Sequence, residues 1–192
     1  MMPLVLSQNG EYEFEEKRSR FIGRCTAISN EQEAQKFINK IRKLEKNANH
    51  NVFAYSVSTT NIVRFNDDGE PSGTSGMPVL NVFDKAGIIN WVCVVTRYFG
   101  GTMLGAGGLV RAYTKAAKGA LDSAKPTELV IYLKYKVCCD YSMLDKVKYN
   151  FKKWDVEVLD INYAESVTLH VQIHDIKAKP FLDGDFYEKY IV

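Results

Sequence analysis

The sequence has few cysteines, no long apolar run and no visible targeting segment. Its four cysteines, Cys25, Cys93, Cys138 and Cys139, include no C-x-x-C spacing, so we expect reduced and mostly buried thiols. No stretch approaches the ~18 apolar residues that a membrane-spanning helix needs. The first residues lack the basic start and following apolar stretch of a secretory signal. These absences favour a soluble, cytoplasmic protein with no membrane partner.

Motifs for nucleotide hydrolysis, dinucleotide binding and metal-dependent chemistry are also absent. The glycine-rich segment lacks G-x-x-x-x-G-K-[ST], and the G-x-G-x-x-G spacing fails because Val110 occupies its last position. No nucleophile elbow, H-E-x-x-H or deaminase signature occurs. His170 and His174 are expected on one strand without a third ligand, so no metal site is predicted there. The sequence therefore predicts a protein without a cofactor and gives little support to an enzyme.

The composition is that of an ordinary globular protein, but its basic residues are unevenly placed. Hydrophobic residues make up 46% and charged residues 25% of the 192 positions, and the net charge is +2. All seven arginines fall within residues 1–125, which hold 16 basic against 12 acidic side chains. Arginine suits bidentate contacts with phosphate. If a polyanion binds this protein, we expect the first part of the chain to bind it, unless the arginines are only solvated or salt-bridged.

Hydrophobic periodicity predicts an α+β fold for the first part of the chain. The core of its last strand, from Trp91 to Val95, is nearly all apolar, as in a central strand that is buried on both faces. The predicted elements are strands within 11–28 and at 52–58, 61–65 and 88–99, helices at 30–45 and 109–121, a polar loop at 47–51 containing His50, a long loop at 66–78 and a glycine-rich turn at 100–108.

The segment Lys125-Pro126-Thr127 punctuates the chain and predicts two domains, residues 1–125 and 126–192. In the second part the pattern predicts strands at 129–139, 156–163 and 167–174, a helix at 142–154, and a final helix or irregular cap after residue 176. The order β-α-β-β-α suggests a small ferredoxin-like domain.

The most unusual stretch combines a strand, a glycine-rich turn and a helix. A helix N-terminus presents unpaired N–H groups and a positive dipole end, so it can hold an anion. Arg97 and Arg111 flank the turn and could add positive charge. The alternative is that the glycines only let the helix pack tightly on the sheet. The glycines in question are Gly100, Gly101, Gly105, Gly107 and Gly108.

A second candidate is the acidic cluster of Asp67, Asp68 and Glu70 in the long loop. Carboxylate oxygens suit Mg²⁺ or Ca²⁺, and with His50 they could form a metal or acid/base cluster of a phosphate-handling hydrolase. The EF-hand pattern fails, however, because no later ligand glutamate follows. The carboxylates could instead pair with Arg97 and Arg111 and fix the loop, and we favour this interpretation.

Two motifs resemble those of one family. DDGEPSGTSGMPVL at Asp67–Leu80 and VVTRYFGGTMLGAGGLVRAY at Val94–Tyr113 are similar to the signature of the YigZ/IMPACT proteins. The resemblance extends upstream through KRSRFIG at Lys17–Gly23 and NANHNVFAYSV at Asn47–Val57, and downstream through residues 127–175.

The resemblance implies a fold and a biological setting. The N-terminal domain should resemble a small-subunit ribosomal protein domain and domain IV of elongation factor G, and the C-terminal domain should resemble domain V. Eukaryotic members of the family regulate translation. By fold analogy this implies a translation-associated module that contacts RNA, the ribosome or a translation factor. A purely protein-binding regulator is a further alternative.

In the first interpretation, the arginines and the glycine-rich turn would line a concave face, and Asp68 and Glu70 would brace it. His50 is placed with this candidate site.

Overall fold

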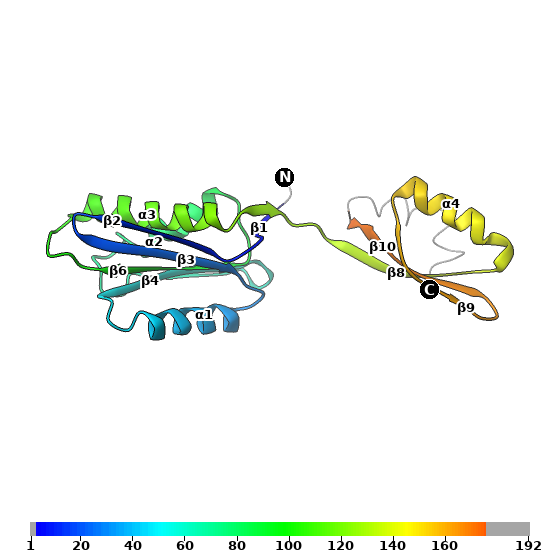
Figure 1. The fold of residues 1–192 in the computed structure, drawn as a ribbon, viewed down its shortest axis with the longest axis horizontal. Helices are drawn as coiled ribbons and strands as arrows, with labels where there is room; N and C mark the ends of the chain where they lie inside the picture. Colours follow the sequence, from blue (N-terminus) through cyan, green and yellow to red (C-terminus); the bar gives the residue numbers. More distant parts are fainter. Residues whose placement is uncertain (1–2, 176–192) are drawn as a thin grey trace. The chain divides into compact units, whose positions relative to one another are not determined.

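The chain folds into two units, each built around an antiparallel sheet, with three described α-helices on the first sheet and one on the second. The computed structural model describes residues 3–175. The units are Met1–Leu129 and Val130–Val192, and the α+β class predicted from the sequence is confirmed (Figure 1). No helix in the described part of the chain is long and apolar enough to cross a membrane.

The first unit is organised around a five-stranded sheet of order β2-β3-β6-β4-β5, in which every neighbouring pair is antiparallel. Its strands are β2 (Gly10–Glu16), β3 (Ser19–Ala27), β4 (His50–Val57), β5 (Ile62–Asn66) and β6 (Trp91–Tyr98). The predicted central strand is confirmed, because β6 lies in the middle and is buried along all but its last residue. Its apolar run follows from helices that cover both faces of the sheet.

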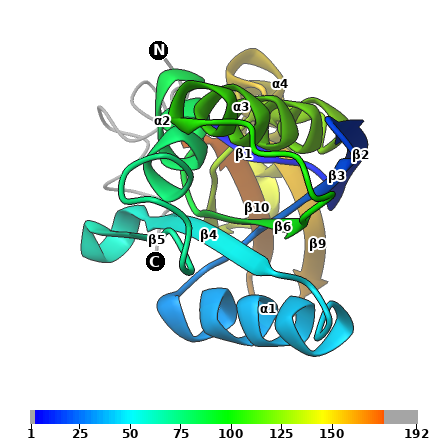
Figure 2. The same cartoon turned by 90° about the vertical axis from the view of Figure 1, so that its left-hand side faces the viewer.

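Helices form a layer on each side of this sheet (Figure 2). Helix α1 (Glu31–Leu44) packs on one face, where its Ile38 meets Val92 and Val94 of β6. Helices α2 (Gly76–Lys85) and α3 (Ala106–Ser123) cover the other face, where Cys93 and Val95 point. The alternation along β6 therefore divides its side chains between two hydrophobic cores.

Close approach of α3 to the sheet depends on two glycines. A Cβ on Gly23 would lie 2.4 Å from the Ala116 carbonyl oxygen, and one on Gly119 would lie 2.2 Å from the Tyr12 ring. No side chain fits at such distances. These glycines fix the spacing between helix and sheet, and so place the N-terminus of α3 against the end of β6.

Two further strands join the ends of the first unit. Strand β1 (Leu4–Leu6) pairs antiparallel with β7 (Pro126–Glu128), in the register Leu6↔Pro126 to Leu4↔Glu128. The sequence pattern did not predict this ribbon, because three-residue strands carry no measurable alternation. The ribbon lies at the opposite end of the unit from the glycine-rich turn (Figure 1).

The structure corrects two local predictions. The segment 66–78 is not a loop throughout, because α2 begins at Gly76. His50 does not lie in a loop but is the first residue of β4. Glycine and proline within the first turn of α2 hide this helix from sequence patterns, although proline is tolerated there.

The second unit has a three-stranded antiparallel sheet of order β8-β10-β9. Its elements are β8 (Tyr132–Cys139), α4 (Leu144–Trp154), β9 (Glu157–Tyr163) and β10 (Val167–His174). Val147 and Phe151 of α4 share one core with the alternate apolar residues of β10. The β-α-β-β order is as predicted, while the final element predicted after residue 176 lies outside the described residues. The ferredoxin-like assignment therefore stays a prediction.

Candidate anion-binding site

A buried ion pair lies beneath the glycine-rich turn. Arg97, near the end of β6, is 5% exposed, and its Nη1 donates to Oε1 of Glu70 at 2.7 Å. The Tyr113 hydroxyl of α3 donates to the same oxygen at 2.7 Å. Burial, together with the Glu70 carboxylate, raises the pKa of the Tyr113 hydroxyl, so this group keeps its proton and donates it. The prediction that the loop carboxylates pair with Arg97 and Arg111 is therefore confirmed for Arg97 only, through Glu70.

The guanidinium of Arg97 is also held between two aromatic rings. Its central carbon lies 5.4 Å from the ring centroid of Phe21 and 5.4 Å from that of Phe99. Nη2 donates to the Ser19 hydroxyl at 3.3 Å, and the same hydroxyl oxygen accepts from the backbone N–H of Gly100 at 3.2 Å. The start of the turn is thus fixed to the ion pair.

Asp68 and His50 form a second cluster on the side of α1. Asp68 pairs with Arg42, Nη2 to Oδ1, at 3.1 Å, and not with either of the two arginines predicted to pair with the loop carboxylates. Its Oδ2 accepts from the backbone N–H of Asn51 at 2.7 Å. His50 Nδ1 lies 2.8 Å from the Asp68 carbonyl oxygen, which can only accept, so Nδ1 carries the proton. His50 Nε2 is 3.8 Å from Glu70 Oε1, so the two clusters are neighbours.

Asp67 stabilises the start of α2 and is not free to bind a ligand. Its Oδ1 accepts from the N–H of Gly76 at 2.8 Å and from both the N–H and the hydroxyl of Ser75, and its Oδ2 accepts from the N–H of Gly73. Burial raises the pKa of this carboxyl, but these hydrogen bonds outweigh burial and hold the pKa below its ordinary value. Asp67 therefore caps α2 from eight residues upstream of Ser75.

The three carboxylates thus have three different sets of partners. Asp67 binds backbone, Asp68 pairs with Arg42, and Glu70 pairs with Arg97. Within the described ranges, no group of three His, Cys, Asp or Glu side chains is placed to hold a metal ion. The three carboxylates do not converge, so the geometry does not support the hydrolase alternative.

Different structural constraints explain why glycine occupies most positions of the turn. Gly100 packs so closely on Arg18 that a Cβ would lie 2.0 Å from the Arg18 carbonyl carbon. Gly101 and Gly105 have φ of 80° and 73°, which side chains rarely adopt. A Cβ on Gly108 would lie 2.9 Å from Cβ of Leu104. Gly107 alone is explained by neither packing nor φ, since its nearest neighbour would be Arg111 Nη1 at 3.6 Å.

A basic cleft lies along the side of α3, from Gly108 to Lys115. It has a volume of about 190 Å³ and is lined by Lys17, Arg111, Lys115, Glu16, Phe14 and Leu104, among others. Lys17, Arg111 and Lys115 are exposed and form no ion pair with any described residue. The Nζ of Lys115 lies 4.2 Å from the Phe14 ring centroid, so its ammonium group makes a cation–π contact with that ring.

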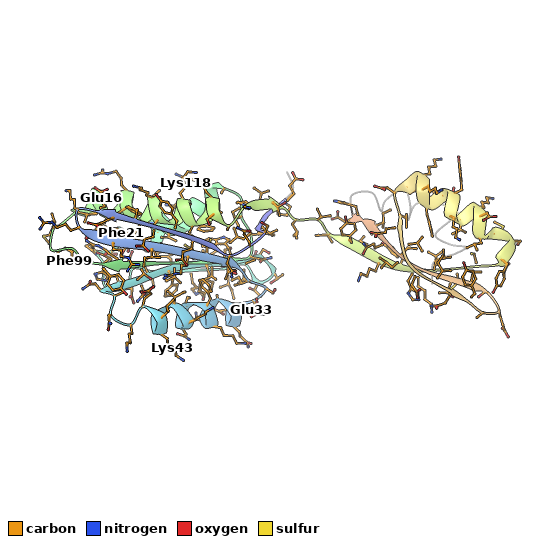
Figure 3. The ribbon with its side chains drawn as sticks, viewed as in Figure 1. Glu16, Phe21, Glu33, Lys43, Phe99 and Lys118 are labelled. Carbon is orange, nitrogen blue, oxygen red and sulfur yellow. The ribbon has the colours of Figure 1, made fainter. Side chains whose placement is uncertain are left out.

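The N-terminus of α3 adds to this positive field. Its N-cap, Gly105, has no side chain to bond the free N–H groups, and no acidic residue lies in the first turn. The partial positive charge of the helix end is therefore not offset by the helix itself. Figure 3 shows Glu16 and Phe99 at this same end of the first unit.

The two arginines predicted to flank the turn have unequal roles. Arg97 is buried and neutralised by Glu70, whereas Arg111 is exposed and lines the basic cleft. Sequence reasoning missed Lys17, in the turn between β2 and β3, and Lys115, on α3. The fold brings these two residues to the same cleft. The helical spacing of Arg111 and Lys115, four residues apart, could have indicated one of these neighbours.

Comparisons with known proteins agree with the motifs. Residues 17–121 match the Impact N-terminal domain, and residues 137–181 match a domain of unknown function, DUF1949. The chain is 38% identical over 178 residues to the IMPACT family member YvyE of Bacillus subtilis (strain 168), covering 92% of this chain and 82% of that protein. It is 30% identical over 168 residues to the IMPACT family member YigZ of Escherichia coli (strain K12), covering 86% and 82%.

A solved structure described as a hypothetical protein is similar over nearly the whole chain. It is 29% identical, has a TM-score of 0.66, and the match covers 94% of this chain and 90% of the other. Taken together, the matched domain and the relatives show that this chain belongs to the YigZ/IMPACT family.

Proposed function

We propose that this protein is a translation-associated binding module that holds the phosphate backbone of RNA in the basic cleft beside α3. One observation supports this proposal most directly. Lys17, Arg111 and Lys115 line one cleft along the side of α3, whose N-terminus is uncapped, and none of the three is ion-paired with a described acidic residue. Unpaired cations and free backbone N–H groups are what phosphate oxygens bind.

The charge around the cleft favours a polyanion over a small neutral ligand. Arg18, on the neighbouring hairpin turn, is also exposed and makes no ion pair with a described residue. Against these cations, the cleft contains one carboxylate, Glu16. Arg97, the other predicted contact, acts here by fixing Gly100 and the start of the turn through Ser19.

The family gives this binding its setting. The resemblance implies regulation of translation in the cytoplasm. The protein would then contact RNA on the ribosome or next to a translation factor. In this proposal residues 1–125 form the binding domain and residues 126–192 form the second domain. The likeness to elongation factor G domains IV and V, including a ferredoxin-like second domain, belongs to the same proposal.

Binding of a fluorescently labelled RNA to the full chain, measured by anisotropy at two salt concentrations, tests the proposal. We expect affinity to fall steeply with salt, because each neutralised phosphate contributes a slope of about −0.7 in log–log form for single strands. A variant with Lys17→Gln, Arg111→Gln and Lys115→Gln should lower the magnitude of that slope by about 2.

The matched control removes the same charge from another face. Lys36, Lys40 and Lys43 lie exposed on α1, on the opposite side of the sheet from α3, where Figure 3 labels Lys43. Replacing these three by Gln should leave the salt slope unchanged. Absence of RNA binding at low salt, or equal loss in both triple variants, would contradict the proposal.

A purely protein-binding regulator is the alternative. It is favoured by the exposure of Met103 (85%) in the glycine-rich turn, since a large exposed apolar side chain often marks an interface. The same RNA measurement separates the two, because a regulator of this kind would show no salt-dependent RNA binding.

A further inference from the structure

A second hollow adjoins the basic cleft. It has a volume of about 220 Å³ and is lined by Phe99, Met103, Leu104, Leu109, Glu70 and Arg97, among others. Leu104 lines both hollows, and the first turn of α3 contributes Gly108 to the cleft and Gly105 to this cavity. A ligand bound in the cleft therefore has the cavity within immediate reach.

The rim of this cavity is apolar and open to solvent. Phe99 is 46% exposed and Met103 is 85% exposed, although both are large hydrophobic side chains. One face of the Phe99 ring is taken by the Arg97 guanidinium at 5.4 Å. The exposed remainder of the ring offers a surface on which a flat ligand can stack.

The polar groups of the cavity are incompletely bonded. Tyr113, Arg97 and His50 all approach Oε1 of Glu70, and no described residue donates a hydrogen bond to Oε2. The Arg97 side chain is likewise buried, and its Nε–H has no hydrogen-bond partner. Arg97 Nε is thus a buried donor without a partner, which is costly, whereas Glu70 Oε2 keeps acceptor capacity that a ligand can use.

We propose that this cavity binds one unpaired nucleobase of an RNA whose phosphates lie in the basic cleft, an inference that rests on the proposed function. The cavity is below the ~300–1,000 Å³ of pockets for drug-sized ligands, so it suits one ring system. Every base has a π-face that stacks on an aromatic ring, and its edge carries both donors and acceptors. Phe99 provides the ring, and Glu70 and Arg97 contribute polar groups to the lining of the cavity.

The test compares two probes of equal charge on the full chain. One is a short fluorescein-labelled oligouridylate, and the other is the same ribose-phosphate chain without bases. We expect the oligouridylate to bind about tenfold more tightly, as stacking of one base on an aromatic side chain implies. Phe99→Ala should abolish this difference and leave the salt slope unchanged. Phe65→Ala is the matched control, because Phe65 is 41% exposed but does not line the cavity.

Each outcome decides a different point. Equal, salt-dependent binding of both probes would overturn the base pocket and leave the phosphate-binding proposal standing. Equal loss of affinity for both probes in Phe99→Ala would also overturn the base pocket. Absence of binding by either probe at low salt would overturn both proposals and leave the cavity to an apolar side chain of a partner protein.

Discussion

Arg97 Nη1 and Glu70 Oε1 lie 2.7 Å apart, with side chains that are 6% and 3% exposed. The pair joins the central strand to the loop before α2, and Tyr113 ties it to α3. A buried ion pair tolerates loss of one partner poorly, because the other charge is then left without compensation. The floor of the candidate site is consequently also a structural joint between three elements.

Glu70→Gln should therefore destabilise the fold strongly. The neutral amide leaves the Arg97 charge buried and unpaired, which costs about 3–5 kcal/mol of unfolding free energy. Urea denaturation of the variant measures this loss. Glu13→Gln removes a partner of the half-exposed Arg20 and should change stability by only about 0–1 kcal/mol. Comparable losses in the two variants would contradict this account of the buried pair.

Asp67→Asn should destabilise the protein at neutral pH but not in acid. The pKa of Asp67 is held below its ordinary value, so the carboxylate contributes stability above about pH 4 that is lost as the pH falls through the folded pKa. We expect the variant to be about 1–2 kcal/mol less stable near pH 7. The gap between the two proteins should close on acidification, as followed by urea denaturation at several pH values. A gap independent of pH would show that charge is not what Asp67 contributes.

Gly23→Ala and Gly107→Ala should have opposite effects on stability. At Gly23 the new methyl group meets the backbone of α3, and overpacking of this kind costs about 1–3 kcal/mol or more. At Gly107 there is room, and alanine favours the helix by up to about 1 kcal/mol. Thermal denaturation of both variants provides the measurement. If RNA approaches the α3 backbone closely, Gly107→Ala should also weaken RNA binding despite its greater stability.

Cys25 should be unreactive toward alkylating reagents in the native protein. Burial raises the pKa of the Cys25 thiol to about 12, and burial also raises the pKa of Cys93. Near pH 8 the thiolate fraction of Cys25 is then on the order of a thousandfold below that of an unfolded cysteine. Iodoacetamide labelling read by mass spectrometry, with and without denaturant, measures the contrast. Rapid native labelling of Cys25 would show that the first unit opens locally.

The sequence predicted the elements that have long apolar patterns. The central strand around Val92–Val95, helix α1 and helix α3 all appear, because burial on one or two faces leaves a clear periodicity. Helix α2 was missed because its first turn consists of loop-forming residues and its cap, Asp67, lies well upstream in the sequence. A cap brought in by a loop is a tertiary contact that local patterns do not contain.

The candidate site was predicted only in part, because some of its contacts are tertiary and leave no local sequence pattern. Motif composition placed Arg97, Glu70 and the glycine-rich turn together, and their pairing follows from opposite charges in adjacent segments. The difference between a buried Arg97 on β6 and an exposed Arg111 on α3 depends on tertiary packing, which local patterns do not contain. The basic cleft depends on the β2–β3 turn reaching α3, a contact between residues almost a hundred positions apart.

The β1–β7 ribbon has a practical consequence for attaching this protein to a surface. Because Leu4 lies opposite Glu128, a tether placed ahead of β1 emerges where the first unit passes into the second (Figure 1). The glycine-rich end of the unit then faces away from the support. N-terminal immobilisation therefore attaches the first unit by the end opposite its glycine-rich turn.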